Sequence, residues 1–532
     1  MSRHGENMRK IKLGVVHGGI TREYFVPSGK NLLETLQKLG YYIPVLCSSR
    51  GACGKCRVKI LAGESAVTRS DAGGFGAHEL ASGFRLACMA FPEDDLLINL
   101  ENVSENEISA VGDFRNNAGL RRFKKIRGAF AVAVDIGTTT LAFALVNLET
   151  SEVDGRLTIV NRQREFGADV ISRIVKANQG RLKEMGVCVK RQINEGILEL
   201  CRANDVEPGK IVKAAVAANT TMLHILLGLS CETLGIFPFT PVTLERMSLS
   251  FGELLGSAST ALKPDVPVEI LPGISTYVGA DIVSGILFAD ILGSGKTSVL
   301  LDIGTNGEIA VIRNGKITCA ATAAGPAFEG GNIRFGTGSV PGAISGCRFR
   351  NGEFEVTTIG GRPPIGICGS GVIDIVSELL KNEIIDETGR LSCEQIAVAP
   401  EIFFTQKDVR ELQLAKSAIR SGVDLLLEHT GTCFEEIDRF YVAGGFGYHV
   451  NFDSAVAIGL IPPELAVKIE LVGNSSLGGA VRLLTEDIRD ELAEIISASQ
   501  ELPLSADKRF NALFVENMVF PECSGLLKSN PE

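Results

Sequence analysis

Four cysteines in the first hundred residues have the types and spacing of an iron–sulfur site. Cys47, Cys53 and Cys56 lie in the segment CSSRGACGKC, and Cys88 follows in RLAC. Four thiolates are the ligand set of a 2Fe–2S cluster. The small residues between the first three would let one loop fold round a cluster and direct its backbone N–H groups at the sulfur atoms. We therefore predict a 2Fe–2S cluster held by these four cysteines.

Zinc is the alternative occupant, because four thiolates also bind zinc tetrahedrally. Zinc sites usually contain two separated C-x-x-C pairs, whereas the first hundred residues contain one, Cys53 to Cys56. The C-x5-C-x2-C spacing is one residue longer than the plant-type C-x4-C-x2-C. It resembles the adrenodoxin type, which also binds 2Fe–2S, and this resemblance favours iron.

Two aspartates precede Gly-Thr turns, in DIGTTT (135–140) and DIGTNGE (302–308). Each aspartate, Asp135 or Asp302, ends an apolar strand. Glycine lets the backbone reverse tightly, and the exposed N–H and hydroxyl groups can hold phosphate oxygens. The two aspartates would hold Mg²⁺ through its waters. The predicted phosphate-binding residues are Gly137, Thr138, Thr139, Thr140, Gly304, Thr305, Asn306 and Gly307.

A third glycine loop, VAGGFG (442–447), follows another apolar strand. Its glycines would let the backbone lie flat against a nucleoside. Two further acids are candidates for orienting an attacking water: Glu308 after the second turn, and Glu329 in GPAFEGG. Either one could equally be a structural hydrogen-bonding group. The residues of the third loop predicted to contact the nucleoside are Gly444, Gly445, Phe446 and Gly447.

The elements that must position these residues change in character along the chain. Residues 10–102 predict two strands joined by a turn, a helix over 29–40, a strand over 56–63 and a last strand region over 84–100, which is the element order of a β-grasp ferredoxin. A polar and then basic segment, 103–128, predicts a linker. From 129 onward, strands and amphipathic helices alternate, which is typical of an α/β protein. The expected helices there cover 165–178, 372–385, 407–430 and 476–498.

This pattern predicts a multidomain chain of mixed α+β and α/β class. We expect a ferredoxin-like domain over 1–102, a linker over 103–128, a middle domain over 129–210 and a C-terminal ATPase domain over 211–532. The repeated D-I-G-T at 135 and 302 suggests that the part after the linker consists of two related halves.

Composition limits the location and the partners of the protein. The formal charge of −10 argues against nucleic acid as a partner, because nucleic-acid binding leaves a basic surface. The start of the chain has no apolar region of a secretory signal, and polar residues interrupt its most apolar tract, so we expect no membrane span. The nine cysteines outside the first hundred residues contain no C-x-x-C pair and are expected to pack as small core residues. We therefore expect a cytoplasmic protein.

The ordered set of three turns resembles the phosphate-1, phosphate-2 and adenosine motifs of the superfamily that contains acetate and sugar kinases, heat-shock chaperones and actin. The resemblance implies two ribonuclease-H-like lobes that close over ATP. A ferredoxin domain followed by that fold resembles the reductive activators of corrinoid proteins, and the resemblance runs essentially from end to end. The supporting motifs are FGADVISRI, AANTTMLHILLG, FPFTP, AAGPAFEGGNIRFG, ICGSGVID, VGNSSLGGA and LSADKRFNALFVENMVFP.

Membership of this family would imply that ATP drives the return of an accidentally oxidised cobalt(II) corrinoid to cobalt(I). The partners would then be a corrinoid protein of a methyltransferase system and an unidentified electron donor, while a homodimer stays open. Three alternatives remain. The chain could be an ATP-dependent redox-sensing clamp, or a small-molecule kinase of the same fold. It could also be an activator of the acyl-CoA dehydratase type, although that group lacks the ferredoxin domain.

Overall fold

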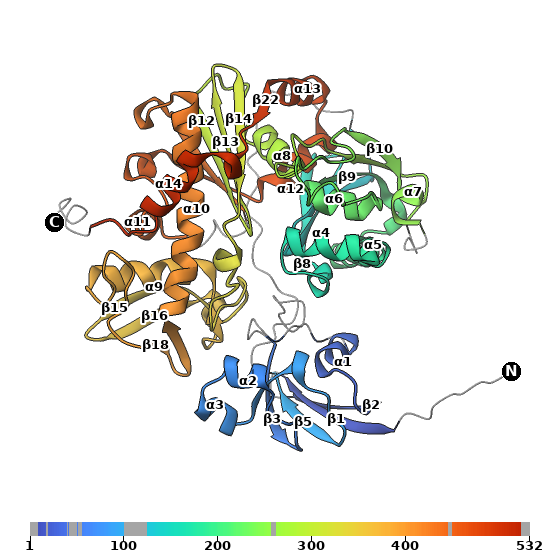
Figure 1. Ribbon diagram of the computed structural model, residues 1–532. Helices are drawn as coiled ribbons and strands as arrows, with labels where there is room; N and C mark the ends of the chain where they lie inside the picture. Colours follow the sequence, from blue (N-terminus) through green and yellow to red (C-terminus); the bar gives the residue numbers. More distant parts are fainter. Residues whose placement is uncertain are drawn as a thin grey trace. The chain divides into compact units, whose positions relative to one another are not determined.

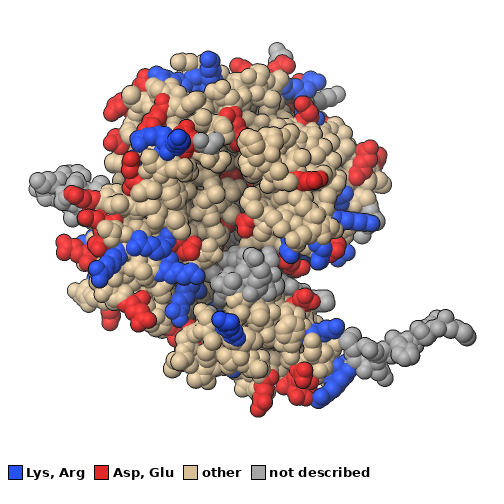
Figure 2. Space-filling view, viewed as in Figure 1, with Lys and Arg blue, Asp and Glu red and all other residues tan. Residues whose placement is uncertain are grey.

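The computed structural model describes residues 9–17, 20–39, 41, 51, 56–100, 125–256, 262–444 and 450–522. The chain divides into two units, Met1–Glu107 and Ile108–Glu532 (Figure 1). No helix among these residues has the length and apolar character needed to cross a membrane. On the face shown in Figure 2, acidic and basic side chains are interspersed.

The first unit contains a five-stranded mixed sheet in the order β2-β1-β5-β3-β4. β1 and β2 form an antiparallel hairpin, and β1 pairs in parallel with β5. Helix α1 buries Leu32, Leu33 and Leu36 in the core of this unit, as its leucine spacing predicts. This arrangement confirms the predicted β-grasp fold. The elements are β1 (Lys10–His17), β2 (Ile20–Pro27), α1 (Leu32–Lys38), β3 (Arg57–Ala62), α2 (Arg69–Gly74), α3 (Ala77–Ala81), β4 (Phe84–Leu86) and β5 (Leu96–Asn99).

The second unit contains two six-stranded sheets, each the centre of one lobe (Figure 1). The first sheet has the order β10-β11-β9-β6-β7-β8, and the second has the order β21-β20-β12-β13-β14-β22. The first-lobe strands are β6 (Phe130–Ile136), β7 (Thr140–Asn147), β8 (Glu152–Val160), β9 (Ile211–Ala218), β10 (Met247–Ser250) and β11 (Pro267–Ile270). The second-lobe strands are β12 (Ser298–Ile303), β13 (Gly307–Arg313), β14 (Lys316–Thr322), β20 (Arg439–Ala443), β21 (Ile469–Gly473) and β22 (Ser499–Glu501).

The two lobes repeat one topology. In each, three successive strands form an antiparallel meander, and the first of the three, β6 or β12, pairs in parallel with a later strand, β9 or β20. The two D-I-G-T motifs lie at the same place in this repeat, at the turn between its first two strands. The prediction of two related halves is confirmed. The first sheet continues to Ile270, so its strands lie on both sides of the position 210 at which we expected the middle domain to end.

Helices α8 (Ala280–Phe288) and α12 (Ser475–Thr485) lie between the two sheets and share their core with both. Val283 and Leu477 on these helices belong to one apolar cluster with Ala133 of β6 and Leu300 of β12. A Cβ on Gly479 would lie 2.3 Å from the Ser284 carbonyl oxygen, so the close crossing of the two helices requires glycine there.

Other helices pack around the two lobes or belong to an insertion. In the first lobe these are α4 (Val170–Lys176), α5 (Leu182–Ala203), α6 (Thr220–Leu227) and α7 (Phe251–Leu255). In the second lobe they are α10 (Gln406–Thr430), α11 (Phe452–Ala457), α13 (Arg489–Ala498) and α14 (Lys508–Glu516). The insertion between β14 and α10 contains β15 (Ala343–Arg350), β16 (Glu353–Thr358), β17 (Gly366–Ile367), α9 (Gly369–Lys381), β18 (Gln395–Ala399) and β19 (Ile402–Thr405).

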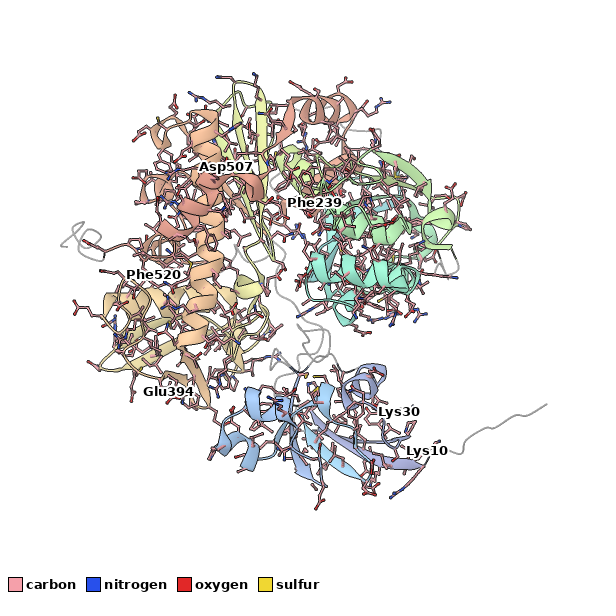
Figure 3. The ribbon with its side chains drawn as sticks, in the orientation of Figure 1. Lys10, Lys30, Phe239, Glu394, Asp507 and Phe520 are labelled. Carbon is pink, nitrogen blue, oxygen red and sulfur yellow. The ribbon has the colours of Figure 1, made fainter. Side chains whose placement is uncertain are left out.

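The C-terminal segment packs on α10 through side chains that bind its backbone. Gln413 donates to the carbonyl oxygen of Met518 at 2.7 Å, and the buried Lys416 donates to that of Val519 at 2.7 Å. The Lys416 ammonium also lies 4.9 Å from the ring centre of Phe520, which Figure 3 labels. These contacts hold the segment that follows α14 against the second lobe.

Candidate functional site

Two of the four predicted cluster ligands lie in the described part of the chain, and the fold brings them together. Cys56 immediately precedes β3, Cys88 lies in the short turn after β4, and their exposed fractions are 1% and 3%. The Cys88 N–H donates to the Cys56 sulfur at 3.5 Å, and the Ala87 N–H donates to the Cys56 carbonyl oxygen at 2.7 Å. Cys47 and Cys53 lie outside the described residues.

The surroundings of this pair fit a cluster loop. Gly51 has a φ of +72°, and a Cβ there would lie 2.7 Å from the Ser70 hydroxyl oxygen and 2.9 Å from the Met89 sulfur. The Asn31 amide donates to the Cys88 carbonyl oxygen at 2.8 Å. The buried Asp71 carboxylate accepts the Leu86 N–H at 2.8 Å, which fixes the strand that leads to Cys88. A glycine where only glycine fits and two buried thiols are what a loop wrapped round a 2Fe–2S cluster needs.

Each Gly-Thr turn is closed by a backbone hydrogen bond from its glycine, which spans three residues in the first turn and two in the second. The Gly137 N–H donates to the Thr140 carbonyl oxygen at 2.9 Å, and the Gly304 N–H donates to the Asn306 carbonyl oxygen at 2.9 Å. Each turn joins the first two strands of a lobe, so the preceding aspartate sits near the end of the first strand. The predicted turn residues thus occupy equivalent places in the two halves.

Glu329 links the two turns across the lobes. Its carboxylate accepts the Thr139 hydroxyl at 2.6 Å and the Thr305 hydroxyl at 2.5 Å. The two hydroxyl oxygens themselves lie 3.4 Å apart. The position of Glu329 at this junction could not be read from sequence spacing. The two threonine hydroxyls that donate to it could also donate to a phosphate oxygen.

Burial and mutual repulsion raise the pKa values of the acids around these turns. Burial, with the nearby Asp281, Asp135 and Glu329 carboxylates, raises the pKa of Asp302 to about 8. Burial and Asp135 raise the pKa of Asp281 to about 6. Burial, with Asp281 and Asp302, also raises the pKa of Glu308 well above its ordinary value. Crowded buried carboxylates of this kind favour a cation or a proton between them.

These acids do not form a complete metal cage. Among the described residues, no three His, Cys, Asp or Glu side chains are arranged to hold a metal ion by themselves. Mg²⁺ commonly binds one or two carboxylates and takes its remaining ligands from water and substrate phosphates. This group of carboxylates therefore suits a metal ion that arrives bound to a nucleotide.

The start of α12 holds Asp135. The Asn474 amide donates to its carboxylate at 2.9 Å and the Ser476 hydroxyl donates at 2.7 Å, while burial raises the pKa of the same group. Asn474 also caps α12 by accepting the Leu477 N–H at 2.8 Å. The helix that follows β21 of the second sheet therefore orients the aspartate of the first sheet.

Two more groups support the first turn. The Asn219 amide, at the start of α6, donates to the Thr138 hydroxyl at 3.1 Å. The Arg173 guanidinium is fully buried and donates to the Thr138 carbonyl oxygen at 2.5 Å; burial and the nearby Arg164 lower its pKa to about 9. Neither contact was predicted, because the partners lie far apart in the sequence.

Of the four residues predicted to contact the nucleoside, the structure describes only Gly444, which directly follows β20. It has a φ of +99°, and a Cβ there would lie 2.5 Å from the Ile303 carbonyl oxygen and 2.8 Å from an Asp302 carboxylate oxygen. Only glycine fits beside the second aspartate. Gly445, Phe446 and Gly447 lie outside the described residues.

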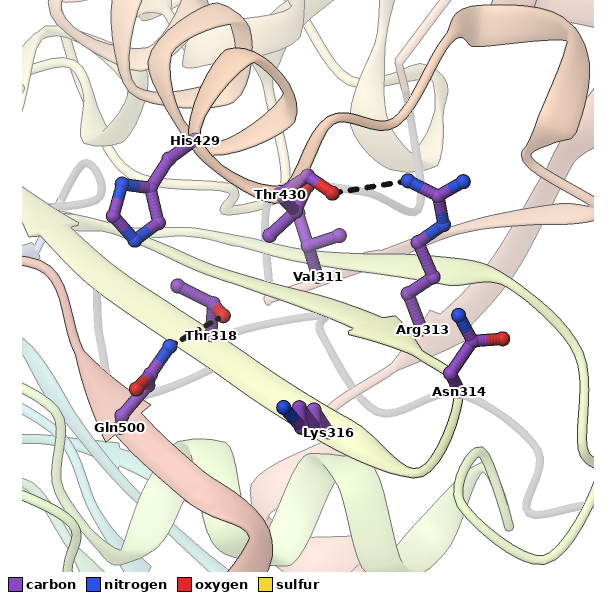
Figure 4. Close-up of a pocket in the computed structure, with 8 residues that line it drawn as sticks. All are labelled: Val311, Arg313, Asn314, Lys316, Thr318, His429, Thr430 and Gln500. Carbon is purple, nitrogen blue, oxygen red and sulfur yellow. Dashed lines mark hydrogen bonds between the residues drawn. The ribbon is translucent and has the colours of Figure 1, made fainter.

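A cavity of about 270 Å³ lies elsewhere in the second unit, between the β13–β14 hairpin, the end of α10 and β22 (Figure 4). Its lining residues are Val311, Arg313, Asn314, Lys316, Thr318, His429, Thr430 and Gln500. None of them is a predicted site residue. The Arg313 guanidinium there already donates to the Thr430 carbonyl oxygen at 2.9 Å and pairs with Glu436 at 2.7 Å.

Three family models match successive parts of the chain. A 2Fe–2S iron–sulfur cluster binding domain matches residues 15–93, a RACo middle region matches 130–294, and the C-terminal domain of RACo, the ASKHA domain, matches 296–529. The first match confirms the iron–sulfur prediction over the zinc alternative. The third supports nucleotide binding in the second unit.

Two curated relatives cover most of the chain. The corrinoid activation enzyme RamQ of Eubacterium limosum is 29% identical over 75% of this chain and 71% of its own. The [Co(II) methylated amine-specific corrinoid protein] reductase of Methanosarcina barkeri is 25% identical over 73% of this chain and 76% of its own. A solved structure, a reductive activator for corrinoid, iron–sulfur protein, superposes with a TM-score of 0.69 at 29% identity, over 96% of this chain and 98% of its own.

Proposed function

This chain belongs to the family of reductive activators of corrinoid proteins, and we propose that it uses ATP to return the cobalt(II) of a partner corrinoid protein to cobalt(I). The observation that carries the proposal is the presence, in one chain, of both the buried Cys56–Cys88 pair and the acidic junction of two ATPase lobes. A redox domain alone would have no use for the second site, and a kinase would have no use for the first.

The need for ATP follows from the direction of the transfer. Cobalt(I) is a stronger reductant than the iron–sulfur donor, and each 59 mV of unfavourable potential reduces the yield of a one-electron transfer about tenfold. The 2Fe–2S cluster, when bound, supplies one electron at a time. A nucleotide can favour the transfer only by binding two states of the protein–partner complex with different affinity.

The residues around the two Gly-Thr turns supply the parts of such a nucleotide switch. Asp135 and Asp302 would hold Mg²⁺ through its waters. The Thr139 and Thr305 hydroxyls would donate hydrogen bonds to phosphate oxygens. Their hydrogen bonds to Glu329 would then be broken. Release of Glu329 would change the link between the two lobes, which is a local event able to bias a two-state element. The backbone of the Gly444 loop would face the nucleoside.

The attacking water has two candidate partners. Glu308 pairs opposite Asp302 in the second sheet and accepts the Asn306 amide at 3.2 Å. Glu329 is placed at the junction of both turns. We propose that Glu308 orients the water and that Glu329 leaves the two threonines when the phosphate binds. The electron would come from a separate donor protein. A measurement of molecular mass would decide between a monomer and a homodimer.

The test is anaerobic formation of cobalt(I) in a cobalt(II) corrinoid protein of a methyltransferase system from the same organism, followed by absorbance. The full chain with its cluster and a chemical reductant should give cobalt(I) with Mg²⁺ and ATP, and little without ATP. Asp302→Asn should lower the ATP-dependent rate by about a hundredfold or more, the order of loss seen when one preorganised electrostatic group is removed from an active site. Asp265→Asn, at an exposed aspartate, is the matched control.

Each contrary outcome identifies an alternative. Equal cobalt(I) with and without ATP would contradict the proposal. ATP-dependent binding of the corrinoid protein without its reduction would favour a redox-sensing clamp. Phosphorylation of an acetate-like or sugar substrate, with no response to the corrinoid protein, would favour a kinase.

A further inference from the structure

The loop after α6 exposes a group of apolar side chains. In the segment Ile236–Val242 the exposed fractions are 60% for Ile236, 81% for Phe237 and 54% for Val242, and the segment carries no charge. Single exposed apolar residues are common on protein surfaces. Three exposed apolar side chains within seven uncharged residues favour a surface that contacts another molecule.

Contacts of Phe239 hold the middle of the loop against Thr276 and Tyr277. The Phe239 ring packs edge-on against Phe237 at 5.9 Å and against Tyr277 at 5.5 Å; Figure 3 labels Phe239 in this loop. The Phe239 N–H donates to the Ile236 carbonyl oxygen at 2.8 Å, and its own carbonyl oxygen accepts the Thr276 hydroxyl. A surface fixed in this way loses little conformational entropy when a partner binds.

The same loop is tied to the nucleotide site through α6. Asn219, which caps α6, binds the Thr138 hydroxyl of the first turn. One turn further along α6, the buried His224 ring lies 2.7 Å from the Thr220 carbonyl oxygen through Nδ1, and its Nε2 accepts the Val242 N–H at 2.9 Å. Because a carbonyl only accepts and an N–H only donates, these two bonds fix the ring with its proton on Nδ1.

A second route joins the same two places. The Thr220 hydroxyl donates to the Ser275 carbonyl oxygen at 2.7 Å, and the next residue, Thr276, binds the Phe239 carbonyl oxygen. A Cβ on Gly279 would lie 2.7 Å from the Asn219 Cα, so the 271–279 segment also packs tightly on the start of α6. Movement of the first phosphate turn would therefore be transmitted to the apolar loop.

We propose that the Ile236–Val242 loop is a docking surface for the corrinoid protein, and that α6 couples this surface to the nucleotide site. The inference rests on the proposed function. The small area favours a transient partner, because a stable homodimer needs about 800 Å² on each partner, far more than three apolar side chains expose. The occupant is an apolar depression on the corrinoid protein into which Phe237 inserts, since buried aromatic side chains dominate the affinity of such contacts.

The experiment compares the full chain with a double variant, Ile236→Ser with Phe237→Ser, and with Val467→Ser as the matched control. Val467 is 92% exposed in the second lobe, so it tests the loss of an exposed apolar side chain elsewhere. The probe is the cobalt(II) corrinoid protein used above, whose Kd is measured with Mg²⁺ and a non-hydrolysable ATP analogue and again without nucleotide. Cluster absorbance, partner-free ATP hydrolysis and oligomeric state are measured on each preparation.

We expect the double variant to raise the Kd at least tenfold with nucleotide and to bring the ratio of the two Kd values close to one. Its cluster absorbance, partner-free ATP hydrolysis and maximal cobalt(I) rate should stay unchanged, and Val467→Ser should bind as the wild type does. An unchanged Kd, an equal effect of Val467→Ser, or dissociation of a dimer by the double variant would overturn the docking surface. Absence of ATP-dependent cobalt(I) in the wild type would instead overturn the proposed function, and this inference with it.

Discussion

The carboxyl group of Asp302 lies among other acids, which gives the proposed nucleotide site a dependence on pH. Its pKa is raised to about 8 and that of Asp281 to about 6, so both groups bind protons more tightly in the folded chain than in the unfolded chain. Without a cation, the free energy of unfolding falls as pH rises from about 4, where aspartate ionises in the unfolded chain, to about 6 for Asp281 and about 8 for Asp302, because only the unfolded chain releases these protons in that range.

Mg²⁺ with a nucleotide should reverse this preference, because a cation stabilises the ionised carboxylates and lowers their pKa values. We expect binding of Mg²⁺ and a non-hydrolysable ATP analogue to release protons near pH 7. The affinity should rise with pH between about 6 and 8, by up to about tenfold per pH unit for each proton released. Calorimetry in two buffers of different ionisation enthalpy measures the release. Asp302→Asn should reduce it, and binding without proton release would contradict the cation site.

The cysteine pair yields a second residue-level prediction. Cys56→Ser should remove the iron and the visible charge-transfer absorbance, because the buried Cys56 thiol is one of the four predicted ligands and serine binds iron poorly in its place. Partner-free ATP hydrolysis should remain, since the nucleotide residues belong to the other unit. Cys393→Ser, at an exposed cysteine, is the control. Full iron content in Cys56→Ser would remove this cysteine from the ligand set.

At the scale of residues, local motifs predicted the chemistry from the sequence, whereas residues that reach the site from distant segments were not predicted. The cysteine spacing and the two aspartate turns are contiguous patterns, so they were readable from the sequence. Asp281, Asn219 and Asn474 reach the site from three separate segments, and nothing in their spacing points to it. The run Gly-Asn-Ser-Ser at 473–476 did carry a signal, since asparagine and serine before an apolar run mark a helix start that can bind an acid.

At the scale of elements, the fold depends on the close crossing of α8 and α12, which carry Asp281 and Asn474. Gly479→Ala should push the helices apart, because its Cβ would lie 2.3 Å from the Ser284 carbonyl oxygen. We expect the free energy of unfolding to fall by about 1–3 kcal/mol, as overpacking usually costs, and nucleotide affinity to weaken as the two side chains move. Urea denaturation and nucleotide titration measure the two effects.

The control for this change is Gly338→Ala, at an exposed glycine whose Cβ would meet no atom within 4 Å. It should leave both stability and nucleotide affinity within error of the wild type. If Gly479→Ala behaved in the same way, α8 and α12 would not hold the two halves of the site in register.

Helix prediction succeeded where the caps were local. The expected helix 407–430 is α10, Gln406–Thr430, since Thr405 forms a capping box and Gly431 ends the helix with a φ of +60°. The expected helix 476–498 is wrong as one element, because it divides into α12 and α13 near the buried Ile488. Neither proline nor glycine occurs between the two helices, so the break depends on tertiary packing.

The expected helix over 165–178 was only partly correct, and its neighbour was missed. Regular α-helix there covers Val170–Lys176, because Asp169 caps α4 after a short 3-10 turn. The 22-residue α5 that follows was not predicted, although Val189, Ile193, Ile197 and Leu200 form a buried stripe at helical spacing. The signal was present there and was overlooked.

At the scale of the whole molecule, domain boundaries are the least visible feature in the sequence. Composition changes at the polar segment after residue 102, so a boundary was expected there. The end of the first lobe has no such mark: β9, β10 and β11 lie after residue 210 and still join β6 in one sheet. Strand pairing over such distances depends on tertiary contacts, which local composition does not encode.

The last prediction follows from the covalent link between the two units. Covalent attachment gives a module an effective concentration of about millimolar at a site that its linker can reach, which a free molecule at micromolar concentration cannot match. If the electron passes from the cysteine site to a corrinoid held by the same chain, mixing Cys56→Ser with Asp302→Asn should restore little activity. One variant lacks the cluster and the other lacks nucleotide turnover, so activity requires the intact halves of two chains to meet on one corrinoid protein.

We expect the mixture at about 1 µM to give less than a tenth of the wild-type cobalt(I) rate, and the rate to rise with protein concentration as an encounter between chains must. Equal amounts of wild type diluted with either variant serve as the control for inhibition. A large rate at 1 µM that does not change with concentration would show that two chains act as one assembly, with the cluster of one serving the nucleotide site of the other. The electron would then cross between subunits, and the two units of one chain would be joined for assembly and not for direct transfer.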